Sequence, residues 1–310
     1  MKWTEDQVPS QTGKLIVVTG ANTGIGYETA RALAAKGARV VLACRNLEKG
    51  QAALQSMLGR MPSGSAHGSG TTLDAAERLE LLHLDLASLD SVRRFASSLA
   101  ERHRSVDVLI NNAGVMFPPA SKTEDGFELQ FGVNHLGHYA VTGLLLPMLR
   151  RADRPRVVSV SSLAHRGGRI DFGSFRSENG YNAFREYAQS KLACLMFALE
   201  LHRRYGFRRE ASMISVAAHP GGTATDLQRH QKVLSVLTRL TAMKPAQGSL
   251  PLLFAATAPE VKGGEYFGPD GPFEIFGHPG RASMSGRAQD EAVARRLWEV
   301  SEELSGVVFT

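Results

Sequence analysis

The segment Thr19-Gly-Ala-Asn-Thr-Gly-Ile-Gly26 decides the fold class of this chain. It follows the β-branched run Leu15–Thr19, which is typical of a buried strand, and it leads into apolar residues at helical spacing. Its three glycines permit a tight turn and let backbone N–H groups approach a pyrophosphate, which the positive end of the following helix also attracts. A plain strand-to-helix turn can use glycines in the same way. The position of this turn after the first strand, at the start of a βαβ unit, favours a dinucleotide site.

The end of the second expected strand indicates which dinucleotide binds. A site for NAD usually carries Asp or Glu there, to bind the ribose hydroxyls. This chain has Ala43, Cys44 and Arg45 instead, and the next carboxylate is Glu48, a turn into the following helix. The planar guanidinium of Arg45 suits a 2′-phosphate, although a solvated arginine at a strand end is the alternative interpretation. We therefore expect NADP(H) as the cofactor.

The rest of the chain alternates short apolar runs with longer helical patterns. The expected strands after the first lie at 40–43, 79–84, 106–110, 156–160 and 213–217, with a weaker one at 265–267. This alternation predicts an α/β fold of Rossmann type, a doubly wound parallel sheet of about seven strands with helices on both faces. We expect a single domain over 1–310. It includes an N-terminal arm at 1–12 and a flexible Gly- and Ser-rich insertion at 59–72.

Composition excludes several other classes of protein. The chain has 310 residues, 43% of them apolar, and its net charge of +6 is spread along the sequence rather than clustered as in a nucleic-acid binder. Its two cysteines, Cys44 and Cys194, form no CxxC motif, which favours a reducing cytoplasm. The N-terminus lacks an apolar core, and the longest apolar stretch, 139–149, is too short to span a bilayer. We expect a cytoplasmic protein without a membrane anchor.

Seven motifs in order make the chain resemble the short-chain dehydrogenase/reductase family from about residue 13 to about residue 270. They are TGANTGIG (19–26), LDL (84–86), NNAG (111–114), VNHLGH (133–138), VSVSS (158–162), YAQSK (187–191) and HPGG (219–222). Three further pieces are most similar to the retinol-dehydrogenase and protochlorophyllide-reductase branch, namely LACRN (42–46), SSLAHRGGRIDF (161–172) and YFGPDG (266–271). The resemblance implies the strand order 3-2-1-4-5-6-7.

Four residues carry the expected chemistry. Tyr187 and Lys191 are four residues apart, so on a helix they share one face, where the ammonium stabilises a phenolate and Tyr187 exchanges a proton with an alcohol or carbonyl. Taken alone, this spacing also fits an ordinary exposed helix pair. Ser162, at the end of the fifth strand, is expected to hold the substrate oxygen, with Ser161 as the alternative one residue away. The resemblance implies that Asn134 completes the tetrad by holding a water that links Lys191 to solvent.

Most of the expected cofactor contacts lie at strand ends, and two lie on the helix that carries Tyr187. They are Gly20, Asn22, Thr23, Gly24, Ile25, Gly26, Arg45, Asp85, Leu86, Asn112, Ala113, Gly114, Tyr187, Lys191, Pro220, Gly221 and Thr223. By resemblance, Asp85 and Leu86 meet the adenine, and Thr223 or Thr225 contacts the nicotinamide. The histidines lack metal-ligand spacing, so we expect no metal, and we interpret His135 and His138 as structural.

The resemblance implies that 226–245 caps the substrate cleft. Its apolar residues recur at helical spacing, which favours an apolar substrate, although helix packing or a subunit contact gives the same pattern. We expect an NADP-dependent oxidoreductase that transfers a hydride between nicotinamide and the carbonyl or alcohol group of a small molecule. The alternative is a non-catalytic dinucleotide-binding sensor or scaffold. Such proteins usually lose the Tyr/Lys pair, which this chain has. A homo-oligomer is compatible with either function.

Overall fold

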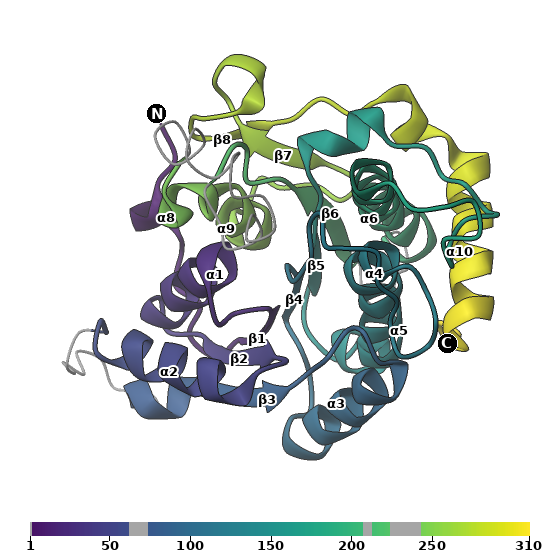
Figure 1. The fold of residues 1–310 in the computed structure, drawn as a ribbon. Helices are drawn as coiled ribbons and strands as arrows, with labels where there is room; N and C mark the ends of the chain where they lie inside the picture. The colour runs from purple at the N-terminus through teal and green to yellow at the C-terminus, as the bar shows by residue number, and fades with distance from the viewer. Residues whose placement is uncertain (1, 62–73, 207–212, 224–242) are drawn as a thin grey trace.

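One sheet organises the chain. The computed structural model describes residues 2–61, 74–206, 213–223 and 243–310 (Figure 1). Within them an eight-stranded sheet has the order β3-β2-β1-β4-β5-β6-β7-β8. The strands are β1 (Leu15–Thr19), β2 (Arg39–Cys44), β3 (Leu79–His83), β4 (Val108–Asn111), β5 (Arg156–Val160), β6 (Ile214–Ala218), β7 (Tyr266–Pro269) and β8 (Pro279–Arg281). The predicted fold class and the order of the first seven strands are confirmed.

The number of strands corrects the prediction of about seven. β1 to β7 are parallel to their neighbours, whereas β8 pairs antiparallel with β7, with Phe267 opposite Arg281. The sequence of β8 is Pro-Gly-Arg, which has little strand propensity of its own. This strand forms because the chain turns back beside β7, and that pairing has no signature in the local sequence.

Helices cover both faces of the sheet, as predicted (Figure 1). One face carries α1 (Gly24–Ala35), α2 (Leu47–Leu58), α8 (Pro245–Gly248) and α9 (Leu250–Thr257). The other carries α3 (Leu89–Arg102), α4 (Leu129–Phe131), a π-helical turn η3 (Gly132–Leu136), α5 (Gly137–Leu149), α6 (Ala183–Tyr205) and α10 (Glu291–Ser305). Alternate strand residues point to each side, so Val17 and Val18 belong to two different core clusters. Single 3-10 turns complete the described elements: η1 (Glu5–Gln7), η2 (Ala75–Arg78), η4 (Leu163–Gly167), η6 (Pro272–Glu274) and η7 (Gly286–Gln289).

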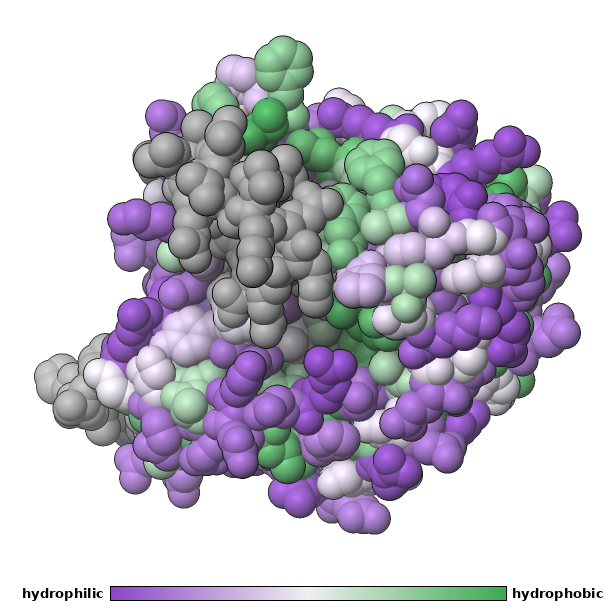
Figure 2. Space-filling model, viewed as in Figure 1, coloured by the Kyte–Doolittle hydropathy of each residue, from purple (hydrophilic) through white to green (hydrophobic). Residues whose placement is uncertain are grey.

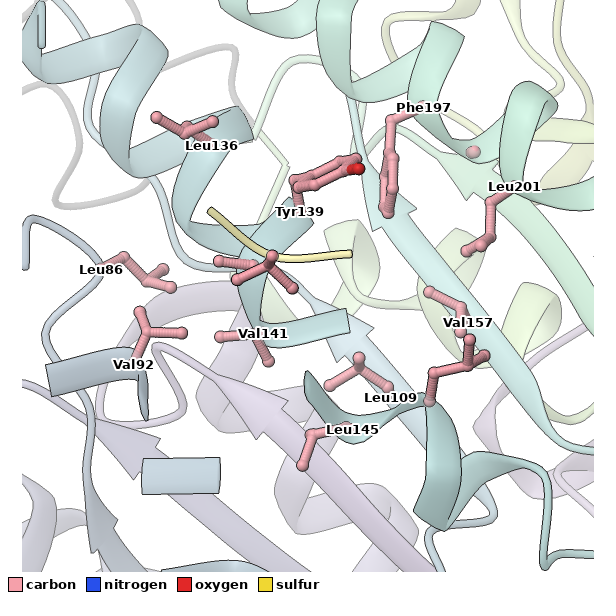
Figure 3. Close-up of a cluster of buried hydrophobic side chains, with 14 of the residues drawn as sticks. Leu86, Val92, Leu109, Leu136, Tyr139, Val141, Leu145, Val157, Phe197 and Leu201 are labelled. Carbon is pink, nitrogen blue, oxygen red and sulfur yellow. The ribbon is translucent and has the colours of Figure 1, made fainter. Parts of the chain in front are cut away.

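The C-terminus covers the outer face of α5 and α6. Figure 3 shows Tyr139 of α5 and Phe197 of α6 together in the core. Their rings also meet Trp298 of α10, at centroid distances of 5.1 Å and 5.8 Å. Phe309, in the tail, lies 4.4 Å from Trp298 and packs against Gly143, where an added Cβ would lie 2.6 Å from its ring. The last residues of the chain are therefore part of the hydrophobic core.

Of the three peripheral segments predicted from the sequence, the structure describes most of the first and little of the other two. The described part of the arm, residues 2–12, packs on the α1/α9 side, where Val8 is buried and the ring of Trp3 meets that of Phe254 edge-on. Most of the insertion at 59–72 and most of the segment at 226–245 lie outside the described residues. No helix of the described residues is long and apolar enough to cross a membrane.

Candidate active site

The glycine turn and the end of β4 interlock at the carboxyl edge of the sheet. Gly20 and Gly24 have φ of +66° and +59°, in the left-handed region that favours glycine. Gly26 lies so close to the side chain of Asn112 and the carbonyl of Gly20 that a Cβ would overlap both. Asn112 in turn donates from Nδ2 to the carbonyl of Thr19, at 2.7 Å. Glycine is therefore required here by the backbone conformation and by the close packing of the turn against the residues that follow β4.

Other predicted turn residues have distinct positions around this cradle. Asn22 and Thr23 lie between β1 and α1, and Thr23 is the residue from which α1 begins. Ile25 is buried in the hydrophobic core on the α1 side. Its side chain therefore anchors the first turn of α1, and a contact with the cofactor would come from its backbone.

A buried hydroxyl ties β1 to the catalytic segment. Thr19 Oγ1 accepts from the backbone N–H groups of Asn112 and Ala113, both at 2.9 Å, and lies 2.9 Å from His138 Nε2. His138 Nδ1 donates to the carbonyl of Asn134 at 2.9 Å, which leaves Nε2 to accept the Thr19 hydroxyl proton. Burial lowers the pKa of His138 to about 4, so the ring is neutral at pH 7. This geometry fits the interpretation of His138 as a structural residue.

Asn134 holds in place the loop that follows strand β4, here called the β4 loop. It lies in the π-helical turn η3, where its Oδ1 accepts from Val115 N at 2.8 Å and its Nδ2 donates to Val115 O at 3.0 Å. Nδ2 also donates to Ser190 Oγ, and the Asn134 carbonyl accepts from Cys194 Sγ as well as from His138. Its side-chain and carbonyl groups thus already have protein partners. The expected water relay through Asn134 stays a prediction.

Tyr187 and Lys191 lie on α6, as predicted, and both are buried. The helix begins after Asn182, whose Oδ1 caps the backbone N–H of Arg185. Lys191 Nζ lies 5.8 Å from the centre of the Tyr187 ring and donates to the carbonyl of Val160, at the end of β5, at 3.1 Å. The ammonium is thereby fixed beside the tyrosine at the carboxyl edge of the sheet.

The side chains of Lys191 and Asn134 both lie next to Gly114. An added Cβ at Gly114 would lie 3.1 Å from Asn134 Oδ1 and 3.5 Å from Lys191 Nζ. The end of β4, the turn η3 and the helix α6 therefore converge, as the order of the motifs predicts.

The two serines after β5 have different surroundings. Ser161 is buried, and its Oγ donates to the carbonyl of Lys191 at 2.7 Å. Ser162 is half-buried, and its Oγ accepts from Ala164 N at 3.2 Å. Among the described residues, the Ser162 hydroxyl proton has no acceptor, so it is available for a ligand oxygen. The geometry favours Ser162 over Ser161 for contact with a substrate.

The remaining predicted cofactor residues surround the same edge. Arg45 is exposed after β2, and Asp85 is half-buried after β3, where its Oδ1 accepts from Ala87 N. Leu86 is buried against Gly137. Pro220, Gly221 and Thr223 follow β6: Gly221 has φ of +65°, and Thr223 Oγ1 donates to the carbonyl of Pro220 at 2.6 Å. Thr225, the alternative nicotinamide contact, lies outside the described residues.

A network of polar side chains next to the end of β6 was not predicted from the sequence. His219 Nδ1 accepts from Gly221 N at 3.2 Å, and its Nε2 donates to Glu274 at 3.1 Å. Glu274 also pairs with Arg166 at 2.8 Å. Burial lowers the pKa of His219 to about 4, so it serves as a neutral linker. No group of His, Cys, Asp and Glu within the described part of the chain is arranged to hold a metal ion.

Two phenylalanines next to Tyr187 were also missed. The ring of Phe117 lies 5.2 Å from that of Tyr187, nearly edge-on, and 6.1 Å from that of Phe184. Phe117 follows β4, and Phe184 lies in the first turn of α6. Phe184 is three residues before Tyr187 on α6, a spacing that puts both on one helix face, whereas only the folded chain brings Phe117 beside them.

Comparisons with known proteins agree with this geometry. The family model described as short chain dehydrogenase matches residues 14–233. Human retinol dehydrogenase 13 is 42% identical over 308 residues, which cover 95% of this chain and 85% of that protein. Human retinol dehydrogenase 12 is 40% identical, covering 98% of this chain and 89% of that protein.

Solved structures match as well. A crystal structure of a Mycobacterium paratuberculosis protein matches with a TM-score of 0.80 and 38% identity, over 100% of both chains. The Pseudomonas aeruginosa RhlG/NADP active-site complex matches with a TM-score of 0.65 and 24% identity, over 86% of this chain and 98% of that chain. This second likeness concerns the fold alone.

Proposed function

Because this chain belongs to the short-chain dehydrogenase family, in its retinol-dehydrogenase-like branch, we propose that it is an NADP-dependent oxidoreductase acting on the carbonyl or alcohol group of an apolar substrate. The observation that carries the proposal is that Lys191 lies beside Tyr187, beside the end of β5 from which Ser162 follows, and beside Gly114 near the glycine turn. Hydride-transfer oxidoreduction follows from the family. The cofactor and the roles of individual residues are our proposal. A cytoplasmic location and the oligomeric state stay predictions from the sequence.

The glycine turn fits a dinucleotide. The positions where Cβ atoms would lie at Gly20 and Gly26 are already taken by the β4 loop, so only glycine leaves the backbone free to face a pyrophosphate. Arg45, exposed and without an ion-pair partner among the described residues, suits the 2′-phosphate of NADP. Bound NADP(H) supplies the hydride, or accepts it in the reverse direction.

The side chains divide the remaining chemistry. In reduction, the Tyr187 hydroxyl gives its proton to the substrate oxygen as the carbonyl carbon receives the hydride, and in oxidation it takes that proton back. Ser162 donates a hydrogen bond to the same oxygen and stabilises its developing charge. Lys191 favours the phenolate by its charge and is near enough to Gly114 to bind a ribose there. Asn134 keeps the segment around Val115 in register with Lys191.

The test is a screen of aldehydes, ketones and alcohols with NADPH or NADP⁺, followed at the nicotinamide absorbance. On a substrate so found, Tyr187→Phe should lower turnover by about 10²–10⁴-fold while NADPH affinity stays the same. Tyr139→Phe is the matched control, because Tyr139 is buried against Trp298 and its hydroxyl has no hydrogen-bond partner among the described residues. Near-normal turnover by Tyr187→Phe would exclude the proposed proton donor. Dinucleotide binding without turnover of any substrate would favour a sensor instead.

A further inference from the structure

A row of three aromatic rings leads from the buried tyrosine to the surface. Phe117 packs edge-on against Tyr187, and Phe184 continues the row at 6.1 Å from Phe117. Phe184 also lies over Gly167, where an added Cβ would be 3.7 Å from its ring, in the turn η4 that follows Ser162. The row therefore flanks the place where Tyr187 and Ser162 would both reach a substrate oxygen.

The fold holds this row in a fixed arrangement. Phe117 has φ of +53°, which non-glycine residues adopt only when their surroundings impose it. Gln130, fully buried, imposes it: its Oε1 accepts from Phe117 N at 2.9 Å and its Nε2 donates to the carbonyl of Ala183, next to Phe184, at 3.0 Å. Tyr181 adds a second tie by donating to the carbonyl of Pro118. The segments that carry the two phenylalanines are thus joined twice.

Packing within the protein does not explain why a phenylalanine is present at position 184. Its side chain is 57% exposed, so folding removes less than half of its apolar surface from water. In the view of Figure 2, hydrophobic residues gather on the surface beside the atoms drawn in grey. A strained phenylalanine and an exposed one, tied together beside a catalytic tyrosine, are arranged for contact with a ligand.

We propose that Phe117 and Phe184 are specificity residues that select an aryl group attached to the reacting carbon, as in an aryl aldehyde or a benzylic alcohol. This inference rests on the proposed function. Tyr187 must reach the substrate oxygen, and the ring of Phe117 packs against the ring of Tyr187. The first substituent on the reacting carbon therefore meets the rings of Phe117 and Phe184, which together form an aromatic wall. A flat ring gains edge-to-face or offset-stacked contacts there in addition to area burial, whereas a saturated ring of equal size gains burial alone.

The test compares benzaldehyde with cyclohexanecarboxaldehyde, which have the same number of carbon atoms but differ in flatness. The quantity measured is the ratio of kcat/KM for the two aldehydes with NADPH. Comparing this ratio between variants cancels the intrinsic reactivity of each aldehyde. Phe184→Leu and Phe117→Leu should each lower the ratio by about 2- to 12-fold, the range for loss of one aromatic pair, mainly through the KM for benzaldehyde.

Phe172→Leu is the matched control. It lies in the same connection between β5 and α6, but its ring meets Phe175 and the guanidinium of Arg296 on α10. This variant should keep the wild-type ratio. Phe184 is exposed, so Phe184→Leu keeps the fold even if Phe117→Leu loses stability. A ratio unchanged in both wall variants would overturn the inference and leave the oxidoreductase function standing.

A binding measurement separates the two proposals if neither aldehyde is turned over. Calorimetry on the NADPH-loaded protein would compare benzyl alcohol with cyclohexylmethanol, a pair for which no hydride transfer from NADPH is possible. A preference for benzyl alcohol that falls in Phe184→Leu supports the wall even without catalysis. Equal binding of both alcohols by the wild type overturns it.

Discussion

Replacing Thr19 with valine tests the buried link between the glycine turn and the catalytic segment. Valine has nearly the same shape but removes one oxygen, which has four partners: the N–H groups of Asn112 and Ala113, the Nε2 of His138 and the carbonyl of Ile110. A buried group left without its hydrogen bond costs about 1–3 kcal/mol. Because Asn112 and Ala113 are only half-buried, water replaces part of the loss, and we expect Thr19→Val to lower the free energy of unfolding by about 2–4 kcal/mol.

The chain offers a control that differs in one respect. Thr29, on α1, is as fully buried as Thr19, but its hydroxyl has no hydrogen-bond partner among the described residues. Thr29→Val therefore removes an oxygen that is already unsatisfied. This variant should be neutral or more stable by up to about 1 kcal/mol.

Urea denaturation followed by tryptophan fluorescence measures both variants, since Trp298 is in the core. The two variants should show the same dependence of free energy on urea and different midpoints. NADPH affinity should fall in Thr19→Val, because the β4 loop beside Gly20 loses its anchor, and should be unchanged in Thr29→Val. Equal midpoints for the two variants would refute the hydrogen-bond reasoning.

Three further predictions follow from the site. The wild type should bind NADPH at least about tenfold more tightly than NADH, and Arg45→Ala should abolish this preference. Fluorescence titration with both cofactors measures the two affinities. If Arg45→Ala still prefers NADPH, residues other than Arg45 bind the 2′-phosphate. Lys191→Met should lower turnover and also weaken NADPH binding, in contrast to Tyr187→Phe, so a variant with full cofactor affinity would contradict a ribose contact. Burial lowers the pKa of His135 to about 3 and that of His138 to about 4, so between about pH 6.5 and 4 the unfolded chain takes up protons that the folded protein does not. Stability should therefore fall as the pH falls through this window, by up to about 1.4 kcal/mol per pH unit for each histidine, and urea midpoints that stay constant from pH 7 to pH 5 would contradict their burial as neutral rings.

The sequence was sufficient to predict those features that depend on a few consecutive residues. The glycines of the first turn are required by φ and by close approach, and short apolar runs mark the seven parallel strands, with β-branched residues in all except β3 and β7, so both features were predictable. β8 was not predictable, because Pro279–Arg281 becomes a strand only by pairing with β7. The aromatic wall was not predictable either, because Gln130 joins segments distant in the sequence through two side-chain hydrogen bonds.

The order of the catalytic residues was available from motifs, but their partners were not. The water relay through Asn134 stays a prediction, whereas the hydrogen bonds of its side chain to Val115 and Ser190 had no signal in the sequence. Ser161 and Ser162 could not be separated by sequence alone. They differ in the folded chain because the Ser161 hydroxyl is within reach of the carbonyl of Lys191 on α6.

The packing of the C-terminal tail has a consequence for synthesis of the protein. Phe309 and Trp298 cover the aromatic face of α5 and α6, and Arg150 at the end of α5 donates to the carbonyl of Thr310, the last residue. During translation, α5 and α6 are made well before α10 and the segment that holds Phe309, so their aromatic face is at first uncovered. The half of the sheet that carries the glycine turn can form first, whereas the aromatic face of α5 and α6 stays exposed, and open to a chaperone, until α10 and Phe309 pack on it.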